Sequence, residues 1–416
     1  MFLPNELLIQ IFMFLTRADC KRTRLVAKKW SLIAADLVFD CVYIRPHDEN
    51  LNAFTAIADH PILHSRVIAI HFDARPFELG LTKDAYLQLL LRQLKLEIRD
   101  SPGFPLNIKF SNGLDEDCQQ LLEHASKPLL LGQFELARKE KDLCHLPIVT
   151  KGYANYRKIA DEQTRRLESA TFWPKITQGL TKMQRIKHIT FDVSWIHSRS
   201  VSNDISNPHL PASFILQPGY TVPGLQWIQL SHLLCASQNS QILPRKLSLE
   251  LDVPEQTSNF ICFSAERYPN VLGTIECLSL SLGPRFTPSC VRPILKLSKL
   301  MPSLRALSVN VTLTAEVSDT SYWAVQELLF RHFPWPTLLK LDLSCVTVEI
   351  EDLFLFLDER PRLQNINLDN VKILKAHCTA TMEAAERFRR IHHSKHVNEQ
   401  MVGGQVGVFG AICRDT

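Results

Sequence analysis

Glycine is scarce in this sequence: 14 of 416 residues are glycine, about 3% and roughly half the usual frequency. The shortage disfavours an enzyme built around glycine-rich phosphate loops, and a turn-rich all-β fold. No apolar run approaches the ~20 residues that span a bilayer. The segment Leu7–Leu15 has neither the basic start nor the small-residue cleavage site of a signal peptide.

The sequence also lacks a large excess of one charge and any regular pairing of cysteines. The 47 Lys and Arg residues against 43 Asp and Glu leave a net charge of +4, too little over this length to indicate a nucleic-acid or membrane partner. The 11 cysteines are odd in number, scattered and never spaced C-x-x-C. They are typical of small buried side chains in a reducing compartment, so we expect an intracellular protein, cytoplasmic and/or nuclear.

Residues 1–45 have the pattern of three short helices. Pro4 suits a first helical turn, and an apolar stripe follows it. A second helix is expected from Cys20 to about Trp30 and a third over Ser31–Val38. Units of this size rarely form a sufficient core alone, so we expect a second protein to dock here. Burial of the stripe against the rest of the same chain is the alternative.

The same segment resembles the F-box family over more than ten positions. The matching residues are Leu3-Pro4, Glu6-Leu7-Leu8, Ile11-Phe12, Leu15, Asp19, Val26 and Lys29-Trp30. The resemblance implies three helices that bind the Skp-type adaptor of cullin-based ubiquitin ligases. The implied adaptor-binding residues are Leu3, Pro4, Leu7, Leu8, Ile11, Phe12, Leu25, Val26 and Trp30. The leucines usual at the start of the second helix are replaced by Cys20-Lys21-Arg22, which would weaken the contact.

The body of the chain carries a repeated L-x-x-L-x-L pattern near Pro-x-(Leu/Val) marks whose prolines are 33, 34 and 25 residues apart. The four strands expected from it are Ile275–Leu280, Leu304–Val309, Leu338–Leu343 and Leu363–Leu368. Weaker copies are Val67–Phe72, Ile186–Phe191, Leu225–Leu230 and Leu247–Leu251. Expected helices are Asp84–Leu96, Gly152–Ala170, Val291–Leu300, Tyr322–His332 and Glu351–Asp358. This spacing is typical of leucine-rich repeats.

The expected fold class is therefore an α+β repeat protein: an N-terminal three-helix F-box, then an irregular leucine-rich-repeat-like solenoid of parallel strands with helices on the convex side. A conventional α/β domain is the alternative. The organisation also resembles the F-box proteins of filamentous fungi with degenerate leucine-rich-like bodies. That likeness includes Phe54-x-x-Ile57-x-x-His60-Pro61, and Tyr156 followed by Gln163.

In such a solenoid the strand leucines face inward and the residues between them line one open surface. This surface is expected to face a protein substrate, although an inert solvated surface is the alternative. Its residues are Ser248, Glu250, Ser279, Ser281, Ser308, Asn310, Lys340, Asp342, Asn365 and Asn367, with Asp369 beside them. Three parts are expected: an F-box domain over 1–45, the repeat body over 46–378, and a helical or flexible tail over 379–416, helical to near Gln400.

Groups that would indicate catalysis or metal binding are dispersed. His392 and His396 would share a helical face, but no acidic ligand or cysteine pair accompanies them. Cys144 and His145 are only sequence neighbours, and no G-x-S-x-G, H-E-x-x-H or G-x-G-x-x-G occurs. We expect no catalytic residue, metal or cofactor, and no nucleic-acid or membrane partner.

The expected function is thus the substrate-recognition subunit of a Skp–cullin–F-box-type ubiquitin ligase. Its expected partners are the Skp-type adaptor, through it a cullin, and an unknown protein substrate. Two alternatives remain at this point: an F-box-containing scaffold that acts outside ubiquitination, and an intracellular α/β enzyme of unknown chemistry.

Overall fold

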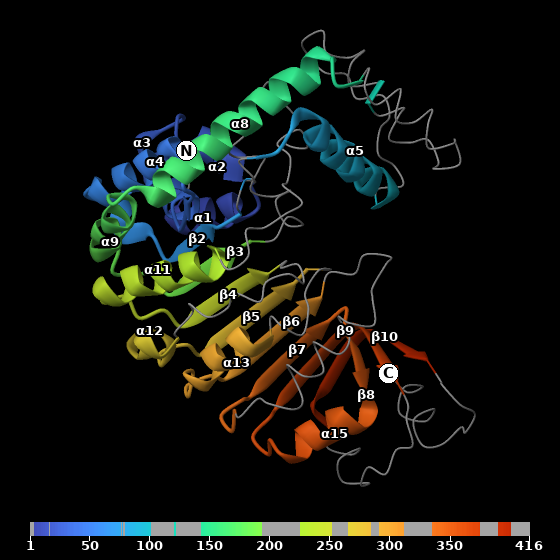
Figure 1. The fold of residues 1–416 in the computed structure, drawn as a ribbon. Coiled ribbons are helices and arrows are strands. Elements are labelled where there is room, and N and C mark those ends of the chain that lie inside the picture. The colour runs from blue at the N-terminus through green and yellow to red at the C-terminus, as the bar shows by residue number, and fades with distance from the viewer. Residues whose placement is uncertain are drawn as a thin grey trace, which may run out of the picture.

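A computed structural model of the chain consists of a small helical unit followed by one long parallel sheet with helices packed on it (Figure 1). It describes residues 4–15, 17–75, 77, 80–100, 120–121, 143–193, 225–251, 265–283, 291–311, 335–374 and 390–400. This is an arrangement of helices and parallel strands, as the strand pattern predicts.

The first three helices are α1 (Asn5–Met13), α2 (Arg17–Thr23) and α3 (Lys28–Val38). Three helices are confirmed, but the expected bounds of the second are wrong. It ends at Thr23, and Trp30 lies in the first turn of α3. The short turn between these helices carries Leu25 and Val26, whose apolar character made them look like part of a helical stripe.

The described strands form one ten-stranded sheet in which neighbouring strands are parallel. The strands are β1 (Cys41–Ile44), β2 (Ala69–Asp73), β3 (His188–Asp192), β4 (Lys246–Leu251), β5 (Cys277–Leu282), β6 (Ala306–Val311), β7 (Lys340–Ser344), β8 (Thr347–Glu349), β9 (Asn365–Leu374) and β10 (His392–Gln400). Their order is sequential from β1 to β7, then β9 and β10, with β8 paired to β9. The sheet therefore grows by one strand at each crossover.

Helical segments make the connections that parallel strands require. They are α4 (Asp48–Asp59), η1 (Leu63–Arg66), α5 (Lys83–Asp100), α8 (Pro147–Glu168), α9 (Phe172–Lys182), α11 (Leu225–Asn239), η4 (Ala265–Arg267), α12 (Pro269–Leu272), α13 (Val291–Lys299) and α15 (Ile350–Asp358). Figure 1 shows α9, α11, α12, α13 and α15 along one side of the curved sheet.

Burial alternates along the central strands, which indicates that the described helices cover one face of the sheet there. In β5 and β6 every second residue is buried and the residues between are partly exposed. Parallel sheets covered on both faces lack this alternation. The buried positions of neighbouring strands align across the sheet, as with Leu278, Leu307 and Leu341. The expected inward direction of the strand leucines is thus confirmed.

Two expected elements are wrong. Leu225–Leu230 begins the helix α11, because Trp227, Leu230, Leu233 and Leu234 continue a three-to-four-residue period that a six-residue window cannot reveal. The helix expected to reach Gln400 is absent over 392–400, where β10 pairs with β9, so His392 and His396 do not share a helical face. Tyr322–His332 and most of the tail lie outside the described residues.

A second core lies between α5 and α8, apart from the core of the sheet. Tyr86 is buried there and contacts the rings of Tyr153 and Tyr156. Pro147 occupies the first turn of α8. Backbone N–H groups in a first turn have no acceptor within the helix, so proline costs no helical hydrogen bond there. The two helices therefore form a packing unit of their own.

The contact between α4 and α9 depends on Gly179. An added Cβ at this position would overlap the ring of Phe54, which is fully buried, and would touch Ala58. We expect Gly179→Ala to lower the free energy of unfolding by about 1–2 kcal/mol, because overpacking outweighs the better helix propensity of alanine. Urea denaturation followed by circular dichroism measures this. Gly80→Ala, where no atom lies within 4 Å of the added Cβ, is the control; equal stability of both variants would refute the prediction.

Candidate functional site

The first three helices share a small core that uses only part of their apolar surface. Leu8 and Phe12 of α1 pack with Cys20, Ala34 and Val38, and each is only 2% exposed. Phe12 also meets the ring of Trp30 edge-on, with centroids 5.7 Å apart. Leu8 and Phe12 recur four residues apart, so one face of α1 is directed to α3.

The remaining apolar side chains of these helices are exposed. Thirteen large apolar side chains are exposed among the described residues, and eight of them lie between residues 7 and 32. The eight are Leu7, Ile9, Ile11, Met13, Phe14, Leu25, Val26 and Leu32. Leu7 and Ile11 are each 46% exposed, Leu25 is 88% exposed and Phe14 is 91% exposed. We call this set the apolar helical surface. Such a concentration on one small unit indicates a protein-binding surface.

The structure separates the expected adaptor-binding residues into two groups. Pro4, Leu7, Ile11, Leu25 and Val26 are exposed. Leu8 and Phe12 are buried in the core that holds α1 on α3, so they are not accessible to a partner while the helices keep this packing. Their expected role in adaptor binding stays a prediction. Trp30 is partly buried against the same core, and Leu3 lies outside the described residues.

Four members of the apolar helical surface were not among the expected contacts. Ile9, Met13 and Phe14 lie off the main stripe of α1, and Leu32 lies in α3. The signal that could have found them was the excess itself: α1 is apolar over more of its circumference than one neighbour can cover.

The uncovered face of the sheet brings all ten expected substrate-facing residues into three adjacent rows. The middle row runs across the strands through Tyr43, His71, Thr190, Ser248, Ser279, Ser308, Asp342 and Asn367. The rows on either side hold the other expected residues, which are Lys340, Asn365, Glu250, Ser281 and Asn310. We call these three rows the open face. His71 and Thr190 were missed although their strands carry weaker copies of the pattern, and Tyr43 was missed because no strand was expected over β1.

Side chains on the open face are short and mostly half-exposed. Lys340 donates to Asp342 at 2.7 Å, and the Oγ of Ser248 lies 2.9 Å from His188 Nε2. Ser248 is the most buried of the expected set. Burial and then the neighbouring charge of Lys246 lower the pKa of His188 to about 4, so this ring is neutral at neutral pH. The face thus offers hydrogen-bonding groups with little net charge at its centre.

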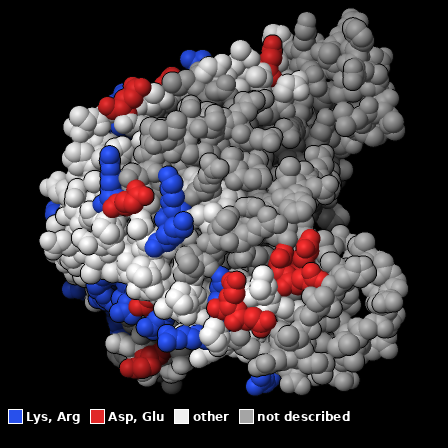
Figure 2. Space-filling model, turned by 60° about the horizontal axis from the view of Figure 1, so that its bottom comes forward, with Lys and Arg blue, Asp and Glu red and all other residues white. Residues whose placement is uncertain are grey.

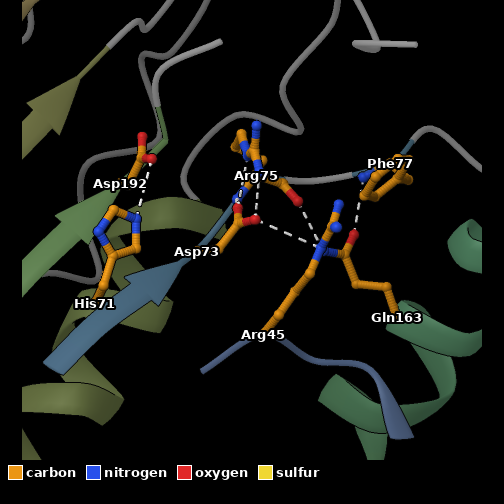
Figure 3. Close-up of polar contacts among 7 residues, drawn as sticks. All are labelled: Arg45, His71, Asp73, Arg75, Phe77, Gln163 and Asp192. Carbon is orange, nitrogen blue, oxygen red and sulfur yellow. Dashed lines mark hydrogen bonds and ion pairs between the residues drawn. The ribbon is translucent and has the colours of Figure 1, made fainter. Parts of the chain in front are cut away.

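A buried ion cluster joins β1, β2 and α8 beside this face (Figure 3). Arg75 donates to both carboxylate oxygens of Asp73, from Nε at 2.7 Å and from Nη2 at 2.5 Å. Arg45, directly after β1, lies 3.5 Å from the same carboxylate and stacks over the ring of Phe77. Gln163 of α8 completes this cluster, which we call the joint. Its side chain donates to Arg75 O at 2.7 Å and accepts from the Phe77 N–H.

The charges in this joint stabilise one another. Burial opposes ionisation of Asp73, but the Arg75 and Arg45 guanidiniums outweigh it and hold the pKa of that carboxyl well below its usual range. His71 Nε2 lies 3.2 Å from Asp192 on β3. Burial lowers the pKa of His71, yet the hydrogen bond and charge of Asp192 prevail and raise it above its ordinary value. No local sequence pattern indicated this joint.

The described residues contain no group of three or more His, Cys, Asp or Glu side chains placed to hold a metal ion. Within the same ranges, no helix has both the length and the apolar composition needed to cross a bilayer.

Comparison with known proteins gives one match. Residues 2–45 match the F-box-like family model, about a tenth of the chain. No curated protein and no solved structure matches the sequence. The matched residues include the three helices that carry the apolar helical surface, so the amino-terminal unit of this chain is an F-box-like domain.

Proposed function

We propose that this chain is the substrate-recognition subunit of a Skp–cullin–F-box-type ubiquitin ligase. The apolar helical surface would bind a Skp-type adaptor and, through it, a cullin. The open face would hold a protein target. The single observation that carries the proposal is the concentration of exposed apolar side chains on the segment that matches the F-box-like model.

The body of the chain supports a target-binding role. Sequential parallel strands covered on one face are the arrangement expected of a leucine-rich-repeat-like solenoid, and we propose that architecture here. The uncovered face presents a broad surface with hydrogen-bonding side chains, which suits a protein or peptide. In this role the chain is not an enzyme: it acts inside the cell by bringing a target close to a ubiquitin-charged enzyme that another subunit carries.

The join between the two binding surfaces favours a fixed spacing. Only two residues separate α3 from β1, and β1 pairs with β2 as part of the sheet. We therefore place the boundary of the F-box unit between Val38 and Cys41. Deletion of residues 1–45 would remove the first strand together with Arg45, so point substitutions are the sounder test.

Substitutions on the open face test the proposal. We expect Ser279→Arg with Ser308→Arg to abolish capture of the target from cells with the proteasome blocked, because two long charged side chains would occupy the middle row. Capture of the Skp-type adaptor should stay unchanged. Asn239→Arg, on the exposed surface of α11, is the matched control.

Three results would oppose this proposal. If no adaptor is captured by the unmodified chain, the proposed function is wrong. If target capture survives the double substitution, the open face is not the target-binding surface. The third result is that the chain captures adaptor, cullin and a target, while the level of that target in cells does not rise when the chain is depleted. That result would favour the scaffold function outside ubiquitination.

A further inference from the structure

Basic side chains gather at one edge of the open face, where the strands begin. Lys187 precedes β3, Arg305 precedes β6, and Lys340 is the first residue of β7. Arg245 and Lys246 lie together at the start of β4. We call these five residues the basic edge. All five are exposed, and none belongs to the contacts used in the F-box unit.

The backbone aligns these residues across the sheet. The N–H of Arg245 donates to the carbonyl of Lys187 at 2.8 Å, and the N–H of Arg305 donates to the carbonyl of Glu276 at 2.7 Å. Neighbouring strands are about 4.8 Å apart, so the basic edge extends over roughly 19 Å from β3 to β7. Lys246 and Lys340 belong to the outer row of the open face. Lys187, Arg245 and Arg305 each precede a member of that row by one residue, so the basic edge borders the open face at the starts of the strands.

The positive charge of this edge exceeds what its neighbours neutralise. Arg245 lies 3.8 Å from Glu276, and Lys340 is paired with Asp342. In the described part of the chain, Lys187, Lys246 and Arg305 form no ion pair. Figure 2 shows Lys and Arg side chains gathered at the lower left, the side on which Figure 1 places the starts of β4 to β7.

We infer that the basic edge binds an acidic segment of the protein target. The inference rests on the proposed function, because it names a feature of the target that the open face holds. Same-side residues of an extended peptide are roughly 6.8 Å apart, so neighbouring acidic side chains can reach neighbouring strands of the edge. Such a segment would supply the anionic partners that Lys187, Lys246 and Arg305 do not find among the described residues.

A protein segment fits the edge better than a nucleic acid does. Glu276 lies between the basic residues of β4 and β6, so the row is interrupted by a negative charge that a uniform phosphate backbone would meet. The five residues of the edge include no aromatic side chain on which a base could stack. An acidic peptide can instead place an uncharged residue opposite Glu276.

A charge-neutralising variant tests the inference in the full-length chain. The variant carries Lys187→Gln, Lys246→Gln and Arg305→Gln, and the probe is a fluorescent twelve-residue peptide of alternating Glu and Ser. We expect the peptide to bind the unmodified chain and the variant to bind it about 10-fold more weakly, measured by fluorescence anisotropy. Affinity should also fall with added salt, since exposed charges are screened.

A second variant controls for net charge. It carries Lys151→Gln, Arg157→Gln and Lys158→Gln on the exposed surface of α8 and should change the affinity less than twofold. The inference is overturned if the peptide does not bind, if both variants lose affinity equally, or if a single-stranded oligonucleotide binds the basic edge more tightly than the peptide. Adaptor capture is measured in parallel. If the unmodified chain captures no adaptor, the proposed function is wrong. If the unmodified chain captures adaptor but does not bind the peptide, only the inference about the basic edge is wrong.

Discussion

Replacing Leu7 and Ile11 with aspartate is expected to abolish binding of a Skp-type adaptor while the chain remains folded. Both side chains lie on the apolar helical surface, where a partner would bury them. Each loses about 1.5–3 kcal/mol of burial free energy, and the buried carboxylates add a desolvation cost. We therefore expect affinity to fall more than about 1,000-fold, which calorimetric titration of the purified adaptor measures.

A matched control separates this effect from a general response to surface charge. Leu355 on α15 is 57% exposed and lies outside the F-box unit, so Leu355→Asp should bind the adaptor as the unmodified chain does. Circular dichroism should give the same melting temperature for all three proteins within a few degrees. Retained affinity in the Leu7 and Ile11 variant would show that the adaptor binds elsewhere.

The second large effect is expected at Asp73. Asp73→Ala leaves the guanidiniums of Arg45 and Arg75 buried without their carboxylate, and breaking a buried pair from one side costs about 3–5 kcal/mol of unfolding free energy. Because the pKa of Asp73 is held below its ordinary value near 4, the ion pair stabilises the fold above that pH. The stabilisation is lost as the pH falls further and the carboxyl is protonated.

Urea denaturation at pH 7 and pH 3 measures both parts of this prediction. The difference in stability between the unmodified chain and Asp73→Ala should be large at pH 7 and smaller at pH 3. Asp342→Ala is the control, because its pair with Lys340 is partly exposed and should contribute no more than about 1 kcal/mol. Equal losses in the two variants at pH 7 would mean that the buried cluster is not stabilising.

Local patterns in the sequence predict much of this fold. The L-x-x-L-x-L spacing identified β5, β6, β7 and β9 because the strands alternate between one buried and one uncovered face. Leu278, Leu280 and Leu282 are buried while Ser279 and Ser281 between them are not, so a period of two is visible in the sequence. The F-box segment could be predicted in the same way, because its matching residues lie close together in the sequence.

The errors have physical causes of two kinds. The spacing of Leu225 and Ile228 is compatible with a strand or a helix. Only the longer stretch to Leu234 shows the helical period of α11. The strand β10 lies at the end of the described sheet and has a polar composition, which on an edge strand protects the unpaired backbone groups from pairing with another chain. Polar edges of this kind resemble solvated helices in sequence.

The candidate site was predictable only where its residues follow a repeat. The open-face rows could be inferred from strand alternation. The division of α1 into buried Leu8 and exposed Leu7 depends on the angle at which α3 crosses it, which no spacing in α1 specifies. The joint of Arg45, Asp73 and Gln163 unites residues from distant parts of the chain, so no local window contains it.

The apolar helical surface has a consequence for copies of the chain that have no partner. Phe14 and Leu25 are almost fully hydrated there, at a cost that any contact with another apolar surface relieves. At high concentration, unassembled copies would meet one another through the same side chains that the adaptor would cover. We therefore expect self-association to compete with adaptor binding, so that added adaptor would keep more of the chain monodisperse.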